Sequence, residues 1–160
     1  MEKPKYQGGS SLKGLNLQYN LVYFMIQDVP AIKLIEKAAE ELKKTENVKL
    51  PQAYTFVKSG VNVERPPQSE DFWYIRSAAI LRKLYIDGTV GTQRLRNVFG
   101  GKRRRGHRPA HHAKAGGKFI RLMLQQLEKE GLVKKNDRPK GRVITPKGQK
   151  FLNAVAKGIK

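Results

Sequence analysis

The amino-acid sequence predicts a mainly α-helical protein of the winged-helix class, the helix-turn-helix variant that ends in a small two-stranded β-wing. Three observations predict this class. Two segments in the second half, one short and one longer, carry apolar residues at helical spacing. Two short runs of strand-forming residues follow, separated by a turn sequence. A Thr-Pro pair then begins a final helix, which completes the order of a winged helix.

A further helix is predicted ahead of this unit. Asp28 is its expected N-cap, with Pro30 in the first turn. Apolar residues between positions 31 and 42 keep a helical period, so an amphipathic helix that ends near Thr45 is expected. Residues 1–24 begin with a stretch rich in Gly, Ser, Asn, Gln and Lys and are expected to form a flexible N-terminal extension. This leaves a single domain over residues 25–160.

The central helix is predicted over residues 72–86, after a start signal at Ser69. It is apolar almost all round, which is typical of a helix buried in the centre of a small domain. A few charged residues interrupt this apolar helix, and the sequence leaves two roles open for them. They form internal salt bridges, for instance to Glu70 or Asp71, or they form an anion-binding edge. These residues are Arg76, Arg82 and Lys83.

The remaining elements follow in winged-helix order. Lys118, Arg121, Gln125 and Lys129 are expected to form an outward polar stripe on the longer helix. The predicted elements are a short helix over 93–99, a helix over 118–130 with Gly131 as its C-cap, strands over 132–135 and 142–144, and a final helix that Thr145 caps and Pro146 begins.

Positive charge is concentrated between the two helices of this unit, in residues 100–118, GGKRRRGHRPAHHAKAGGK. No acidic residue occurs between Asp87 and Glu128, and the whole chain has a net charge of +20. Clustered charge of one sign attracts a polyanion, so a nucleic acid is the expected partner. Four glycines and Pro109 predict a long basic loop without regular structure. The candidate contact residues here are Arg94, Lys102, Arg103, Arg104, Arg105, His107, Arg108, His111, His112, Lys114, Lys118 and Arg121.

Several other function classes lack the residues that they need. The chain has no cysteine, which excludes disulfides and thiolate metal sites and fits a cytoplasmic protein. No apolar run approaches the roughly twenty residues that span a bilayer. The Gly-Lys pairs lack the spacing of a phosphate-binding loop. The three histidines have no carboxylate nearby, so they are expected to stack on bases, to bond phosphates or to be plain loop residues rather than to bind a metal. We therefore expect no enzyme activity, no cofactor, no small-molecule substrate and no membrane contact.

Two nucleic-acid functions compete at this point. A winged-helix regulator of transcription would bind DNA through its longer helix, after a tight turn of three or four residues. Here the connection is the long basic segment, which would obstruct entry of that helix into a major groove. A dimerisation element or effector domain is also not evident. Structured RNA, which is recognised through phosphates, 2′-hydroxyls and shape, is the favoured partner.

Four motifs, in order, carry a resemblance to a known family. They are EDFWYIRSAAILRKLY, GGKRRRGHRPAHHAKAGG, IRLMLQQLEKEGLV and GRVITPKGQKFL. Over about residues 28–159 the chain resembles the archaeal and eukaryotic small-subunit ribosomal protein nineteen-e family. The resemblance implies a winged-helix protein in the head of the small ribosomal subunit that acts there as a monomer. It also implies binding to small-subunit ribosomal RNA and neighbouring small-subunit proteins, and a role in late maturation of the subunit. Family arginines correspond to Arg76, Arg82 and Arg121.

Overall fold

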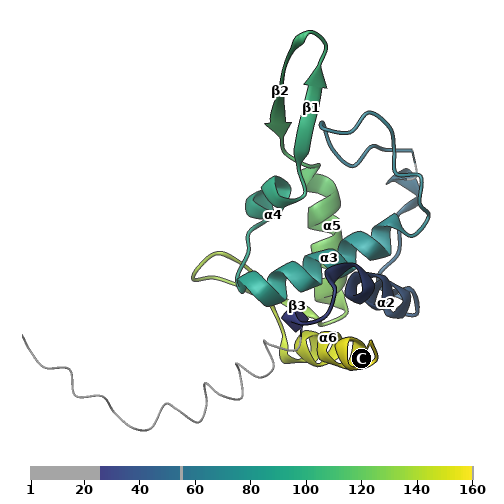
Figure 1. The fold of residues 1–160 in the computed structure, drawn as a ribbon. Coiled ribbons are helices and arrows are strands. Elements are labelled where there is room, and N and C mark those ends of the chain that lie inside the picture. Colours follow the sequence, from purple (N-terminus) through teal and green to yellow (C-terminus); the bar gives the residue numbers. More distant parts are fainter. Residues whose placement is uncertain (1–25, 55, 160) are drawn as a thin grey trace, which may run out of the picture.

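Helix α3 crosses the middle of the molecule, with α2, α5 and α6 packed against it and α4 packed against α5 (Figure 1). A computed structural model describes residues 26–54 and 56–159, so the extension predicted over residues 1–24 lies outside the described part. The elements are α2 (Ala31–Lys43), η1 (Gln52–Tyr54), α3 (Phe72–Asp87), α4 (Thr92–Val98), β1 (Gly101–Arg105), β2 (Arg108–Ala113), α5 (Gly117–Lys129), β3 (Val133–Asn136), β4 (Gly141–Ile144) and α6 (Pro146–Lys157).

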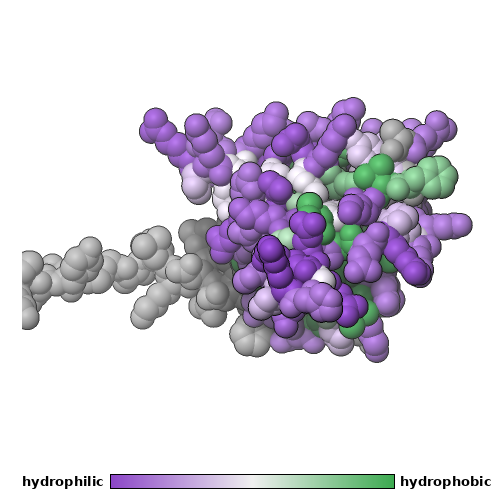
Figure 2. All heavy atoms as spheres, turned by 90° about the horizontal axis from the view of Figure 1, so that it is seen from above, coloured by the Kyte–Doolittle hydropathy of each residue, from purple (hydrophilic) through white to green (hydrophobic). Residues whose placement is uncertain are grey.

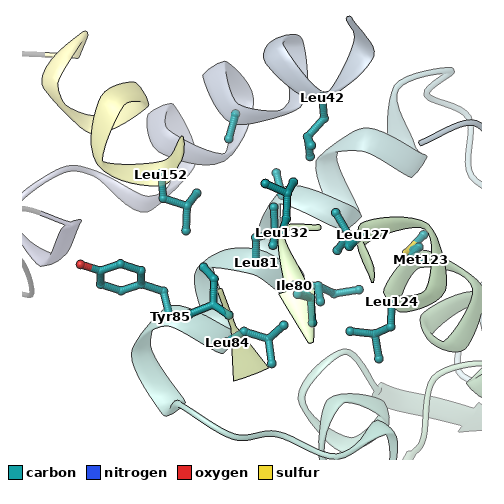
Figure 3. Packing of buried hydrophobic residues seen from close by; sticks show 14 of the residues in the cluster. Leu42, Ile80, Leu81, Leu84, Tyr85, Met123, Leu124, Leu127, Leu132 and Leu152 are labelled. Atoms are coloured by element: carbon teal, nitrogen blue, oxygen red, sulfur yellow. The ribbon is translucent and has the colours of Figure 1, made fainter. Parts of the chain in front are cut away.

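The core forms where α2, α5 and α6 meet α3, as the prediction of a buried central helix requires. Figure 3 shows Ile80, Leu81 and Leu84 of α3 pointing into side chains from the surrounding elements. Leu127 of α5 and Leu152 of α6 are fully buried among them. The apolar face predicted for the longer helix is confirmed, because Phe119, Ile120, Met123, Leu124 and Leu127 are all buried.

The winged-helix order is confirmed by α4, α5, the β3–β4 hairpin and α6. Strands β3 and β4 pair antiparallel, with Val133 opposite Ile144 at the open end. Val90 adds a bridge to the wing through two backbone hydrogen bonds of 3.0 Å with Arg142. Thr145 caps α6 as predicted, because its hydroxyl accepts a hydrogen bond of 3.2 Å from the backbone N–H of Gly148.

The predicted N-cap of the first helix is wrong. Helix α2 begins at Ala31, so Pro30 occupies the cap position, and no side chain caps the helix. Asp28 lies two residues before Pro30. From there its carboxylate does not reach the free N–H groups of the first helical turn, which a capping side chain must bind. The backbone carbonyl of Pro30 instead accepts the first helical bond, from Leu34 at 3.1 Å.

The prediction of an irregular basic loop over residues 100–118 is also wrong. Strands β1 and β2 form an antiparallel hairpin that projects from the body of the molecule (Figure 1). We call this hairpin, residues 101–113, the finger. Its physical cause is a two-residue turn in which Gly106 has a φ of +68° and is followed by His107. A glycine with positive φ at the first turn position matches the right-handed twist of the two strands.

Replacing Leu127 should test the helix face that builds the core. Leu127→Ala removes a side chain with 0 % exposure and should lower the free energy of unfolding by about 2–5 kcal/mol, because a cavity remains. Chemical denaturation measures this loss. The matched control is Gln125→Ala on the exposed side of α5, which should change stability by less than about 0.5 kcal/mol. Equal effects of the two substitutions would contradict the packing described here.

Candidate nucleic-acid interface

The finger has no core of its own, so its order depends on its base. An isolated two-stranded hairpin is at best marginally stable in water. At the base, the backbone N–H of Ala115 donates to the carbonyl of Arg96 at 3.0 Å, and Arg96 Nε donates back to the carbonyl of Ala115 at 3.0 Å. These paired bonds fasten the returning strand to α4. They also give Arg96 a structural role that sequence reasoning missed, because nothing in the sequence marks its partner.

A second clamp joins the finger to the segment between α2 and α3. We call this segment, residues 47–68, the connector. The N–H of Gly116 donates to the carbonyl of Ser59 at 2.8 Å, and Gly60 forms a bridge with Ala115. A Cβ at position 116 would lie 2.7 Å from the Ser59 oxygen, so only glycine allows this approach. The glycines of the basic segment therefore shape the hairpin and its anchorage rather than preventing regular structure.

The finger presents positive charge without any compensating carboxylate. Every side chain from position 102 to position 112 is exposed. Across the two strands Lys102 faces His112, Arg103 faces His111 and Arg105 faces Arg108. Arg105 and Arg108 are therefore like charges directly opposite each other, an arrangement that destabilises a hairpin. Within the described part of the chain, no ion pair involves a finger side chain. The free finger therefore carries a repulsion that an external anion would relieve.

The basic surface continues from the finger onto α5. Lys114 is exposed just after β2, and the predicted outward stripe of α5 is confirmed, since Lys118 and Arg121 are both exposed. Lys118 Nζ lies 5.4 Å from the ring centroid of Tyr54, which places this ammonium group above the connector. Figure 2 views the molecule from the side of the finger and shows a face dominated by hydrophilic residues.

Arg76 of α3 lies between two aromatic rings. Its guanidinium carbon is 4.5 Å from the ring centroid of Phe99 and 5.2 Å from that of Phe72. Burial lowers the pKa of Arg76, but a guanidinium titrates so far above neutrality that it stays charged. The salt bridge considered with Asp71 does not form, because that carboxylate pairs with Lys43 at 2.6 Å. Ring faces, rather than a carboxylate, therefore hold the Arg76 cation.

The other basic residues near α3 divide into two kinds. Arg82 is half-buried, and its Nε is a buried donor without a hydrogen-bond partner among the residues described. Lys83 instead lies 3.1 Å from Asp87 Oδ1, and Arg94 lies 4.0 Å from Oδ2 of the same carboxylate. Asp87 thus neutralises part of the charge of Lys83 and Arg94, whereas no ion pair neutralises Arg82 among the described residues.

The structure places most of the predicted residues on the finger and α5, and the rest on neighbouring elements. Eight lie on the finger, namely Lys102, Arg103, Arg104, Arg105, His107, Arg108, His111 and His112. Lys118 and Arg121 follow on α5, while the others lie on α3, on α4 and directly after β2. In the described ranges, no three His, Asp or Glu residues are grouped as a metal ion would need. The helices there are also too short or too polar to cross a membrane.

Comparison with known proteins finds one family. The family described as "Ribosomal protein S19e" matches residues 25–160. A protein of Aeropyrum pernix is 45 % identical over 134 residues, which cover 82 % of this chain and 87 % of that protein. A protein of Emericella nidulans is 42 % identical over 132 residues, covering 82 % and 89 %. Both relatives are named small ribosomal subunit protein eS19.

Replacing Arg76 should show how much the two ring contacts contribute to folding. Arg76→Gln removes the planar cation and should lower the free energy of unfolding by about 0.5–2 kcal/mol, the range of partly desolvated cation–π contacts. Thermal or chemical denaturation of the isolated protein measures it, with Arg121→Gln on the exposed face of α5 as the control. A loss of about 3–5 kcal/mol, the size that follows disruption of a buried ion pair, would contradict the absence of an acidic partner.

Proposed function

The chain belongs to the ribosomal protein S19e family, and from this premise we propose that it binds small-subunit ribosomal RNA through the finger and the neighbouring basic faces of α3 and α5. Family membership itself implies a structural, non-enzymatic component of the small ribosomal subunit. The proposal further assigns residues 25–160 to one RNA-binding domain. It also includes a place in the head of the subunit as a monomer, beside other small-subunit proteins, and a contribution to late maturation.

The single observation that carries RNA binding is the charge of the finger. Its strands carry five exposed lysine and arginine side chains, Arg105 lies directly opposite Arg108, and the finger contains no carboxylate. Such an arrangement is unfavourable in the free protein and becomes favourable when phosphates lie between the cations. Phosphate contacts of this kind position a protein on a nucleic acid without reading its sequence.

The position of the finger favours RNA over a DNA operator. In a DNA-binding helix-turn-helix, the N-terminal residues of the second helix contact base edges in the major groove. Here β2 ends at Ala113 and α5 begins at Gly117, so the finger stands at the N-terminus of that helix. Figure 1 shows the hairpin extending beyond this end of α5. A projecting finger would prevent the helix from entering a groove, whereas it can reach along the phosphates of a folded RNA.

Arg76 and Arg82 would extend the contact onto α3. Both are cations without a carboxylate partner among the described residues, and both are partly withdrawn from water. Hydrogen bonds from arginine to phosphate are strong because both groups are charged and their geometries match. Lys83 and Arg94 share Asp87 and are expected to contribute less to RNA binding than these two arginines.

Removing the charges of β1 should separate binding from folding. A variant in which Lys102, Arg103, Arg104 and Arg105 are all serine should change stability by at most about 0.5 kcal/mol per site, because the four side chains are exposed. Its slope of log affinity against log salt should flatten by roughly 3, at about 0.7 per lost phosphate contact with single strands. Titration with ribosomal RNA fragments at several salt concentrations measures the slope.

The matched control keeps the same loss of charge but places it elsewhere. Lys33, Lys44, Lys150 and Lys157 are exposed and lie on or next to α2 and α6, away from the finger (Figure 1). Replacing these four by serine should leave the salt slope nearly unchanged. Parallel slopes for the wild type and the β1 variant would show that the finger does not hold phosphates.

Substitutions in α3 should separate assembly from stability. Arg82→Gln and Arg76→Gln should remain folded but fail to stay attached to small subunits at moderate salt, because each loses a cation that has no internal carboxylate partner. Sucrose-gradient sedimentation of subunits from cells that express each variant measures this attachment. Lys83→Gln is the control, since Asp87 already neutralises that lysine. If all three variants remain attached like the wild type, α3 does not face the RNA.

A further inference from the structure

The connector exposes an aromatic ring that the proposed phosphate contacts do not use. Phe56 is 89 % exposed, and its neighbours Val57 and Val61 are 41 % and 52 % exposed. A phenylalanine left in water forgoes the roughly 1.5–3 kcal/mol that burial of such a side chain provides. Single exposed apolar residues are ordinary, whereas Phe56 and Val57 are consecutive and Val61 is close to them in sequence, which makes this segment a candidate contact surface.

This ring is carried by an anchored turn. The N–H of Val57 donates to the carbonyl of Tyr54 at 3.2 Å, and the Tyr54 ring packs edge-on against Phe119 of α5 at 5.2 Å. Further back, Gln126 Nε2 donates to the carbonyl of Lys49 at 2.7 Å while its Oε1 accepts from Trp73 Nε1. The connector is thus fixed to both α3 and α5, and Phe56 projects from a supported position.

The same turn is joined to the basic interface. Ser59 and Gly60 form the backbone clamp with Gly116 and Ala115 at the base of the finger. Tyr54 precedes Phe56 by two residues in the chain. Its ring centroid lies 5.4 Å from Nζ of Lys118, the first exposed cation of α5. Phe56 therefore belongs to the side of the molecule that the finger and α5 present to RNA.

The charge around the patch indicates what kind of partner covers it. Between Glu46 and Glu64 the connector has no acidic residue, and it contributes the exposed Lys49 and Lys58. Figure 2 shows hydrophobic residues among the hydrophilic ones of this face, some of them at its edge. A partner with a flat apolar face and negative charge beside it matches this combination. An unpaired nucleotide has both features, a base that stacks and a phosphate next to it.

We propose that Phe56 stacks on an unpaired base of the bound RNA, with Lys58 and Lys118 placed to contact the flanking phosphates. This inference rests on the RNA binding proposed above and adds a preference for RNA that has an unpaired base over continuous duplex. Stacking of a base on an aromatic ring is tolerant of sequence, because every base has a π-face. The preference would therefore be for structure, such as a loop or bulge, rather than for a particular nucleotide.

Binding to two RNAs of equal length and charge tests this stacking contact. One RNA is a continuous duplex, and the other contains an unpaired loop. Phe56→Ala should weaken binding of the looped RNA by roughly 5- to 150-fold, the effect of removing one stacking platform. Binding of the duplex should not change. The salt slope should also stay unchanged, because the substitution removes no charge. Ile32→Ala, at another exposed apolar side chain, on α2, is the control and should affect neither RNA.

Two further variants identify the chemistry. Phe56→Trp should keep the affinity of the wild type, and its emission should be quenched by the looped RNA; Trp73 is fully buried and should respond little. Phe56→Leu keeps an apolar side chain but has no π-face, so it should bind as weakly as Phe56→Ala. Wild-type affinity of Phe56→Leu for the looped RNA would overturn stacking.

The remaining outcomes separate this inference from the proposed function. If Phe56→Ala binds both RNAs like the wild type while the β1 serine variant still flattens the salt slope, the stacking contact is wrong and RNA binding stands. If Phe56→Ala keeps its RNA affinity but detaches from assembled subunits, the patch contacts a protein, which also overturns the proposal. If the wild type binds neither RNA, the proposed function itself fails.

Discussion

Backbone pairing at the base of the finger is the constraint on which the rest of the interface depends. A hairpin whose lysine and arginine side chains face histidine or arginine has neither a hydrophobic face nor oppositely charged cross-strand pairs, so its own interactions do not make it stable. The chain that follows β2, Ala115 and Gly116, is held instead by Arg96 of α4 and by Ser59 and Gly60 of the connector. Because α4 and the connector are themselves fastened to the core around α3, the rigidity of the winged helix is transmitted to the finger.

The sequence predicts best those helices whose apolar residues recur at helical spacing or whose ends carry a clear start signal. The buried face of α5, the all-round apolar α3 and the Thr145–Pro146 start of α6 follow from local patterns, and the structure has them. The finger has no such period, since exposed strands of arginine and histidine show no alternation between apolar and polar residues. From composition alone, its glycines predict a loop. In the structure, Gly116 instead allows a close approach to a backbone atom far away in the sequence, the Ser59 carbonyl oxygen.

The sequence predicts which basic residues form the interface, but not which of them pair with other residues of the protein. A long interval without carboxylates is visible in the sequence and correctly locates the exposed positive charge. Which cations are already neutralised depends on tertiary contacts: Asp87 reaches Lys83 and Arg94, whereas Arg76 lies against Phe72 and Phe99. Hence a list of basic residues overstates the number that remain available to an outside anion.

Placing the charge on a projecting finger also reconciles a net charge of +20 with a small hydrophobic core. Self-repulsion destabilises a compact state most when like charges are close together. Moving cations onto a hairpin that extends beyond α5 increases their distance from the charges of α2 and α6 (Figure 1). Bound phosphates would then neutralise the finger where repulsion is strongest. Since any ligand that binds only the folded state stabilises it, the proposed RNA binding would couple to folding through the same hairpin.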